Sequence, residues 1–285
     1  MADWKHLVEN IKVRDCMTPV LGDRISSTIQ GPNSRSSKAH GLTGYSLVGS
    51  FDDYIYDGYE PVAATFYSAS AEWVVPSYVS VSGYANATDT HWVSIGGDGT
   101  NMWQAGIEVD QRNGFRFWNE EVNAQNTCCP VNYEGPVISP GNTVSAYVDY
   151  CFTYTNPCES YVYVANQTTG HSFSRYVTWT PGTGNTFFIS ERSTVNGCIT
   201  PLEEWKEAQN PQNLLYSIPW QLAYAGEITG GIHEDQELGL YPYYGYSMTT
   251  NGPSGGTLLA EHTAVGSDNR SFYTTWDNFG PKNSC

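Results

Sequence analysis

WVSIGGDGTNMWQAGIEVD, residues 92–110, is the stretch that decides the fold expected for this chain. It shows β periodicity around a Gly-Gly-Asp-Gly turn, because the side chains of a strand point alternately to its two faces. After the turn, one face carries Met102, Gln104, Gly106, Glu108 and Asp110, and the other carries Trp103, Ala105, Ile107 and Val109. Gln104 therefore lies on a polar face, and Gly106 leaves room there for another backbone, such as that of a substrate, to approach the amide.

A later run, NTFFISERST, is predicted to be an apolar strand that ends in a carboxyl group. Phe187, Ile189 and Glu191 share one face of it. A carboxyl group on an apolar wall is partly desolvated, which raises its pKa and lets it exchange protons in acid. Gln104 and Glu191 together suggest a catalytic pair made of one amide and one carboxyl group.

The composition favours an all-β fold. The 285 residues include 28 Gly, 15 Pro and 21 Tyr, and short alternating runs such as 144–150 and 161–165 recur along the chain. This pattern favours an antiparallel β-sandwich of two packed, curved sheets, jelly-roll or concanavalin-like, over an α/β fold. We expect one or two short helices, one near the N-terminus and one opened by the capping box at residues 200–203.

The formal net charge of −16 restricts the partners of the chain. Nucleic-acid phosphates would be repelled, so we expect no nucleic-acid partner. Protonation of surface carboxylates in acid would discharge the protein, so the composition suits an acidic medium. No apolar run is long enough to span a membrane, and the six His lack the spacing of metal ligands, so we expect neither a membrane partner nor a metal.

Seven short motifs occur in a fixed order along the chain. They are Gly44-Tyr45, W-x-V-P at 73–76, W-V-x-I-x-G at 92–97, Q-x-G at 104–106, aromatic-Trp-x-Glu at 117–120, I-x-E-R at 189–192 and S-F-x-x-x-W at 271–276. In this order they resemble the glutamic peptidases, or eqolisins, which are acid-acting endopeptidases built on a β-sandwich. Collinear matches over most of the chain are far more specific than any one motif.

The resemblance implies a mechanism and a set of site residues. Glu191 and Gln104 would hold one water; Glu191 takes its proton during attack on the peptide carbonyl and returns it to the leaving amine. Gln104 would donate its NH₂ group to the developing oxyanion. Trp92, Trp118 and Glu120 would line the cleft and bind the polypeptide substrate. The resemblance implies no metal, no cofactor and no covalent intermediate, and insensitivity to pepstatin; we expect a monomer.

The chain also departs from this family at three positions. Gly41-Leu42 replaces an Asn-Trp pair, Gly96 replaces an Asp of the fungal members, and Phe115 replaces a Tyr whose hydroxyl could hold substrate. These changes concern the preference of the subsites more than the chemistry. Residues 200–245 have no clear counterpart, so we interpret them as an insertion.

The N-terminal 40 residues differ in charge from the rest. Six Lys and Arg against four acids give residues 1–40 a net charge of +2, which leaves −18 for the remainder. We interpret them as an N-terminal extension of a single domain formed by residues 41–285. By resemblance this extension is a propeptide released in acid, as in a zymogen; the alternative is an extension packed permanently on the sandwich.

Two features favour a secreted protein, although no signal peptide is visible. The sequence contains three glycosylation triplets, beginning at Asn86, Asn166 and Asn269. Its seven Cys are at positions 16, 128, 129, 151, 158, 198 and 285, and we expect disulfides among them. Cys151 and Cys158 flank a turn and could close a short loop, but the connectivity cannot be deduced from spacing.

A glycan-binding or glycan-cleaving sandwich is the alternative function. Exposed Trp and Tyr stack on sugars, and Glu120 with Glu191 could act as acid and base. Gln104 argues against this alternative, because a glycosidase uses two carboxyl groups and has no evident use for an amide between them.

Overall fold

The protein is represented by a computed structural model that describes most of the chain from Tyr56 to Gly280. The described residues are 56–61, 66–78, 87–96, 101–110, 113–122, 131–150, 159–178, 181, 186–192, 194–195, 198–199, 201–206, 217–229, 232–241, 243–249 and 257–280. The predicted N-terminal extension and its helix, Gly44-Tyr45 and Leu42 therefore lie outside them. Of the seven Cys, only the backbone of Cys198 is described.

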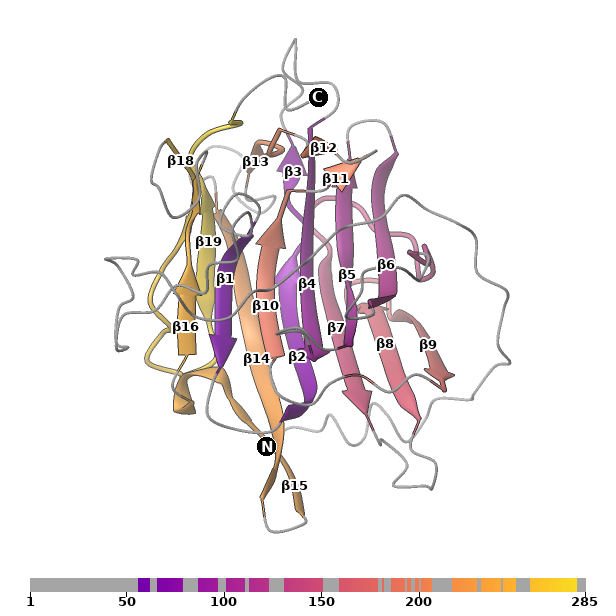
Figure 1. Cartoon of the computed structure of the whole chain (residues 1–285). Helices are drawn as coiled ribbons and strands as arrows, with labels where there is room; N and C mark the ends of the chain where they lie inside the picture. The colour runs from indigo at the N-terminus through magenta and orange to yellow at the C-terminus, as the bar shows by residue number, and fades with distance from the viewer. Residues whose placement is uncertain are drawn as a thin grey trace.

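Two antiparallel sheets pack face to face (Figure 1). The smaller has the order β16 (Tyr243–Tyr246), β1 (Tyr56–Pro61), β10 (Thr186–Glu191), β4 (Thr88–Gly96), β5 (Met102–Asp110), β6 (Gly114–Val122). The larger has the order β17 (Met248–Thr249), β18 (Leu258–His262), β19 (Phe272–Trp276), β14 (Ser217–Thr229), β2 (Phe66–Val74), β7 (Thr143–Tyr150), β8 (Ser160–Asn166), β9 (His171–Val177), and β15 (Ile232–Glu237) also pairs with β14. The predicted antiparallel β-sandwich is confirmed.

Short elements complete the described fold. Two small ladders pair β11 (Thr194–Val195) with β12 (Cys198–Ile199), and β13 (Trp205–Lys206) with β3 (Ser77–Tyr78). A single-turn 3-10 helix, η2 (Leu238–Leu240), follows β15. Among the described residues, no helix has the length and apolar character needed to cross a membrane.

The core lies between the two sheets and follows the alternation predicted from the sequence. Trp103, Ala105, Ile107 and Val109 of β5 all belong to the core, as the period-two pattern requires. The large sheet contributes the facing apolar residues of β2, β7 and β8: Ala69, Ala71, Trp73, Val144, Ala146, Val148, Val162 and Val164. Burial of these two apolar faces holds the sheets together.

The stretch 200–245 takes part in the sandwich. Its β14 is an interior strand of the large sheet, paired with β2 on one side and β19 on the other. The helix expected from the capping box at 200–203 is wrong for the described residues, because Leu202 forms a bridge with Thr88 and Trp205–Lys206 pairs with β3. Tertiary strand pairing has overridden a local helix signal here. The interpretation of this stretch as an insertion stays a prediction.

Two buried carboxyl groups make the fold sensitive to pH. Burial raises the pKa of Asp89 to about 6, although the neighbouring His91 opposes the shift. Burial also raises the pKa of Asp149 well above its usual range, although the hydroxyl of Tyr147 opposes it. A raised carboxyl pKa means that the folded state binds a proton that the unfolded chain has already released, so folding becomes less favourable as the pH rises.

We therefore predict that the free energy of unfolding falls between about pH 4 and pH 6. Asp89 alone accounts for about 2 kcal/mol of this fall, because its pKa is raised by about two units and the window covers only part of that titration. Urea unfolding at the two pH values measures the change. Asp89→Asn should reduce the fall, whereas Asp268→Asn, at an exposed carboxyl whose pKa is lowered, should preserve it. An equal fall in wild type and Asp89→Asn would contradict the prediction.

Candidate active site

All five predicted site residues lie on one face of the small sheet. The register aligns four strands, β10, β4, β5 and β6, and the side chains of each aligned row share a face. Three successive rows on this face read Phe187–Ser94–Gln104–Glu120, Ile189–Trp92–Gly106–Trp118 and Glu191–Thr90–Glu108–Arg116. The face is the one opposite the core.

The amide of Gln104 is held by a carboxyl group of the neighbouring strand. Gln104 Nε2 donates to Glu120 Oε2 at 2.7 Å. This contact fixes the amide orientation, because an ionised carboxylate only accepts hydrogen bonds and the NH₂ group must face it. One amide N–H is engaged in this way, and Oε1 of Gln104 has no hydrogen-bond partner among the described residues. Oε1 is therefore a buried acceptor without a partner in the part of the chain that the structure describes.

The carboxyl group of Glu191 is held from β4. Trp92 Nε1 donates to Glu191 Oε2 at 2.8 Å, and the Thr90 hydroxyl donates to the Glu191 backbone carbonyl at 3.4 Å. Thr90 and Trp92 alternate with His91 on β4, so both point to the site face. One short segment of β4 thus orients Glu191.

The ladder separates Gln104 from Glu191 by two strands and four positions along the strand. In a flat sheet this offset places their Cα atoms roughly 16 Å apart. A water shared by both groups requires the two long side chains to extend toward each other and the sheet to curve inward. Trp92 and Gly106 occupy the row between them.

The site face is buried, although it carries several polar residues. Gln104, Glu120, Glu191, Trp92 and Trp118 are each at most 2 % exposed. Hydrogen bonds explain how these polar groups tolerate burial, since each of the two carboxyl groups accepts from a side chain of its own sheet. The low dielectric around them strengthens every contact they make.

The interpretation of Gly106 also needs correction. A Cβ atom on Gly106 would lie 2.0 Å from the His91 carbonyl oxygen and 2.7 Å from Trp92 Cα. The missing side chain therefore admits the backbone of β4, and the space it leaves is taken by this chain and not by a substrate. Gly106 sets how closely β4 and β5 approach, with Trp92 and Trp118 on either side of it in the row.

Two of the three departures from the family pattern fall on described residues. Phe115 pairs with Val109, packs against the core and stacks on Tyr78 with ring centroids 5.4 Å apart. It faces away from Gln104, so the hydroxyl missing there does not affect the site, contrary to our expectation. Gly96 ends β4 with a φ of 83°, a left-handed conformation that glycine adopts without strain.

A charged pair that the sequence motifs did not predict lies beside the rows of Gln104 and Glu191. Arg116 Nε donates to Glu108 Oε2 at 2.6 Å, and the guanidinium lies 3.4 Å from the ring centre of Tyr133. Burial, followed by the charge of Glu108, raises the pKa of Tyr133. The pairing register of β5 and β6 would have predicted the Glu108–Arg116 pair, because it places the two residues opposite each other.

The sequence also did not predict the contacts that His91 makes. His91 is fully buried and contacts Asp89 and Ser190. The pattern Asp-x-His on an apolar strand was the available signal, because it places both side chains on one face. Among the described residues, no group of three or more His, Cys, Asp or Glu could hold a metal ion.

The glycosylation triplets differ in their surroundings. Asn166 is fully buried, and its Nδ2 donates to the Val137 carbonyl and to Asn142 Oδ1, so the fold as described leaves no access for a glycan. Asn269 lies on a turn and is half-buried, with a positive φ of 59°. Asn86 lies outside the described residues.

The fold and the motifs identify the class of protein. The sequence model of the Peptidase A4 family matches residues 57–209, which is more than half of the chain. The chain therefore belongs to the Peptidase A4 family, the eqolisins, and is a peptide hydrolase that acts on polypeptides. No curated protein matches it.

Solved structures show the same fold. One is scytalido-glutamic peptidase with a peptide-based transition-state analogue, with a TM-score of 0.60 and 18% identity over 79% of this chain and 98% of that one. Another is SCP-B, an eqolisin in complex with the tripeptide Ala-Ile-His, with a TM-score of 0.57 and 18% identity over the same shares. The described sandwich continues through β14 to β19, beyond the end of the family match.

We predict that Gly106→Ala destabilises the protein by at least about 2 kcal/mol, because the added methyl group overpacks the β4–β5 interface. Urea unfolding followed by circular dichroism measures the loss. Gly170→Ala is the matched control: Gly170 lies in a hairpin turn with φ of 72° and open space around its Cβ position. The control should lose only about 1–2 kcal/mol through backbone strain. Equal losses would show that the close approach at Gly106 is unimportant.

Proposed function

We propose that the chain is an acid-acting glutamic endopeptidase in which Gln104 and Glu191 activate one water for attack on a peptide bond. The observation that carries this proposal is the row geometry. The two groups share one buried face of a rigid sheet, and each is oriented by a side-chain hydrogen bond, to Glu120 and from Trp92 respectively.

The chemistry follows from the groups available on that face. Glu191 accepts a proton from the attacking water and then delivers it to the leaving amine, as general base and then general acid. The N–H of Gln104 that does not contact Glu120 donates to the oxyanion that forms on the carbonyl. A neutral donor of this kind works at any pH, and its preorganisation in a buried site increases its effect.

Glu120, Trp92 and Trp118 complete the proposed site. Glu120 holds the amide of Gln104, so it acts through the oxyanion donor. Trp118 lies in the row beside Glu120, fully buried, with its Nε1 lacking a hydrogen-bond partner among the described residues. That indole N–H is a donor that a peptide carbonyl could satisfy.

Operation in acid is supported by the buried carboxyl groups. Asp89 and Asp149 both favour the protonated form in the folded state, so the fold gains stability as the pH falls. The net charge of −16 is reduced by protonation in the same range. We extend this proposal to secretion, to disulfides and to removal of residues 1–40 as a propeptide. An intact Met1 in fully active enzyme would exclude the propeptide.

We predict that Glu191→Gln abolishes acid proteolysis, because the amide cannot exchange a proton while the shape of the side chain is preserved. Digestion of a denatured protein in acid, with pepstatin present, measures the activity. Glu121→Gln is the matched control, since Glu121 lies on the same sheet but pairs with Arg175 away from the dyad. The control should remain active. Full activity of Glu191→Gln would refute the assignment.

We predict that Gln104→Ala lowers kcat about 10²–10³-fold, the loss expected when an oxyanion donor is removed. Steady-state cleavage of a quenched fluorescent peptide gives kcat and KM separately. Because the donor acts in the transition state, KM should change little. A negligible change in kcat would show that Gln104 takes no part in catalysis.

A further inference from the structure

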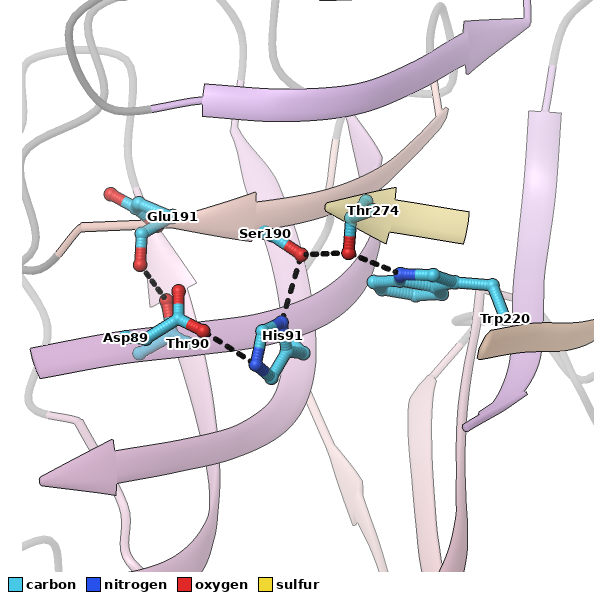
Figure 2. Close-up of polar contacts among 7 residues, drawn as sticks. All are labelled: Asp89, Thr90, His91, Ser190, Glu191, Trp220 and Thr274. Atoms are coloured by element: carbon cyan, nitrogen blue, oxygen red, sulfur yellow. Dashed lines mark hydrogen bonds and ion pairs between the residues drawn. The ribbon is translucent and has the colours of Figure 1, made fainter. Parts of the chain in front are cut away.

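A chain of buried polar contacts lies on the core face of the small sheet, opposite the face that carries Glu191 (Figure 2). His91 Nε2 lies 2.5 Å from Asp89 Oδ2, and His91 Nδ1 lies 2.8 Å from Ser190 Oγ. Ser190 Oγ lies 3.0 Å from Thr274 Oγ1, and Trp220 Nε1 donates to the same Thr274 oxygen at 3.2 Å. Five side chains thus form one continuous path.

The path crosses the core from one sheet to the other. Asp89 and His91 belong to β4 and Ser190 to β10, whereas Thr274 belongs to β19 and Trp220 to β14. All five are at most 1 % exposed. Polar groups in such surroundings are costly unless each has a partner, so the path is stable only when it is complete.

The order Asp–His–Ser is that of a serine hydrolase, but the location excludes that chemistry. Ser190 faces the core between the two sheets, whereas Gln104 and Glu191 face the opposite side, and its hydroxyl is shared between His91 and Thr274. No substrate carbonyl can reach it there. The path must therefore influence other residues of this chain and not a substrate.

The donors of the path all point toward Asp89 when His91 is neutral. An ionised Asp89 only accepts, so His91 Nε2 carries the hydrogen and His91 Nδ1 accepts from the Ser190 hydroxyl. Trp220 can only donate, so Thr274 accepts from it and donates to Ser190. The two hydroxyls can also reverse their roles, which keeps the path connected when Asp89 is protonated in acid.

The path is joined to Glu191 through the two strands that hold it. Ser190 directly precedes Glu191 on β10. Thr90, which donates to the Glu191 carbonyl, lies between Asp89 and His91, and Trp92, which donates to the Glu191 carboxyl group, follows His91. The path thus contacts the core faces of β4 and β10. On the site face, β10 carries Glu191 and β4 contacts it.

We propose that Asp89, His91, Ser190 and Thr274 are positioning residues, whose path of polar contacts locks β10 to β4 and to the large sheet and thereby holds the Glu191 carboxyl group against Trp92. This inference rests on the proposed function, in which Glu191 is the proton carrier. Its consequence is that breaking the path loosens Glu191 without touching the substrate-facing surface.

The test uses substitutions in the full chain that remove one link and preserve shape. Ser190→Ala removes the hydroxyl between His91 and Thr274, and Thr274→Val removes the link to both Ser190 and Trp220 without changing side-chain volume. Thr274→Ser restores the hydroxyl and is the rescue variant. Val164→Ala, in the core face of β8, is the control for a general loss of core stability.

We predict that Ser190→Ala and Thr274→Val lower kcat about 10–100-fold with little change in KM, the size of effect expected when a catalytic group is displaced by about 1 Å. Kinetics are measured in conditions where circular dichroism shows each variant fully folded. Thr274→Ser and Val164→Ala should keep kcat within about twofold of wild type. If Ser190→Ala and Thr274→Val lose no more kcat than Val164→Ala, the path is only structural and the inference is overturned.

The indole N–H of Trp92 gives a readout that is independent of activity. It donates to Glu191, so its hydrogen exchange with solvent, followed by NMR and assigned with Trp92→Phe, reports how firmly Glu191 is held. We expect faster exchange in Ser190→Ala and Thr274→Val, and wild-type exchange in Val164→Ala. Unchanged exchange in both path variants would overturn the inference.

The two failures can be told apart. An active Glu191→Gln enzyme would refute the proposed function, whatever the path does. An inactive Glu191→Gln enzyme together with normal kcat in Ser190→Ala and Thr274→Val would leave the proposed function standing and refute only the positioning role.

Discussion

The register of the β10–β4–β5–β6 ladder is the constraint on which the rest of the site depends. Because side chains alternate with a period of two, a shift of the pairing register by one position would move Gln104 and Glu191 to the core face of the sheet. The apolar set of β5 opposes this slip, since Trp103, Ala105 and Ile107 pack in the core between the two sheets in the observed register. Gly106 adds a local restraint, because β4 and β5 approach closely only at a residue without a side chain. Hydrophobic burial on one face therefore fixes the polar arrangement on the other.

Strand β4 serves both faces of this ladder. Thr90 and Trp92 contact Glu191 on the site face, and Asp89 and His91 begin the polar path on the core face. Both faces are shielded from water, so their hydrogen bonds act at low dielectric and are costly to break. The Glu191 carboxyl group accepts from an indole N–H of β4, and β4 is itself joined to β10 on the core face by His91 and Ser190. Such rigidity suits a mechanism that depends on the placement of one proton carrier.

The sequence predicted the sandwich, the faces of β5 and β10, and the membership of all five site residues in one surface. It failed where a contact depended on distant residues. The capping box at 200–203 indicated a helix, but pairing with β3 and a bridge to Thr88 gave extended structure. Phe115 was interpreted as the loss of a hydroxyl that could hold substrate, although its position in the alternation puts it on the core face. Gly106 was interpreted as room for a substrate backbone, but the register shows that the backbone of β4 takes this space.

By itself the sequence determined the family, the period-two pattern and the identity of the amide and carboxyl groups, because these depend on residue order and local side-chain alternation. The tertiary structure decided which strand lies beside which, and so decided that Glu120 orients Gln104 and that Trp92 holds Glu191. It also decided that Asp89, His91, Ser190, Thr274 and Trp220 meet in the core. These partners come from strands up to 185 positions apart in the chain. The physical reason is that strand pairing and sheet packing are long-range, so no local pattern specifies which buried polar groups will satisfy one another.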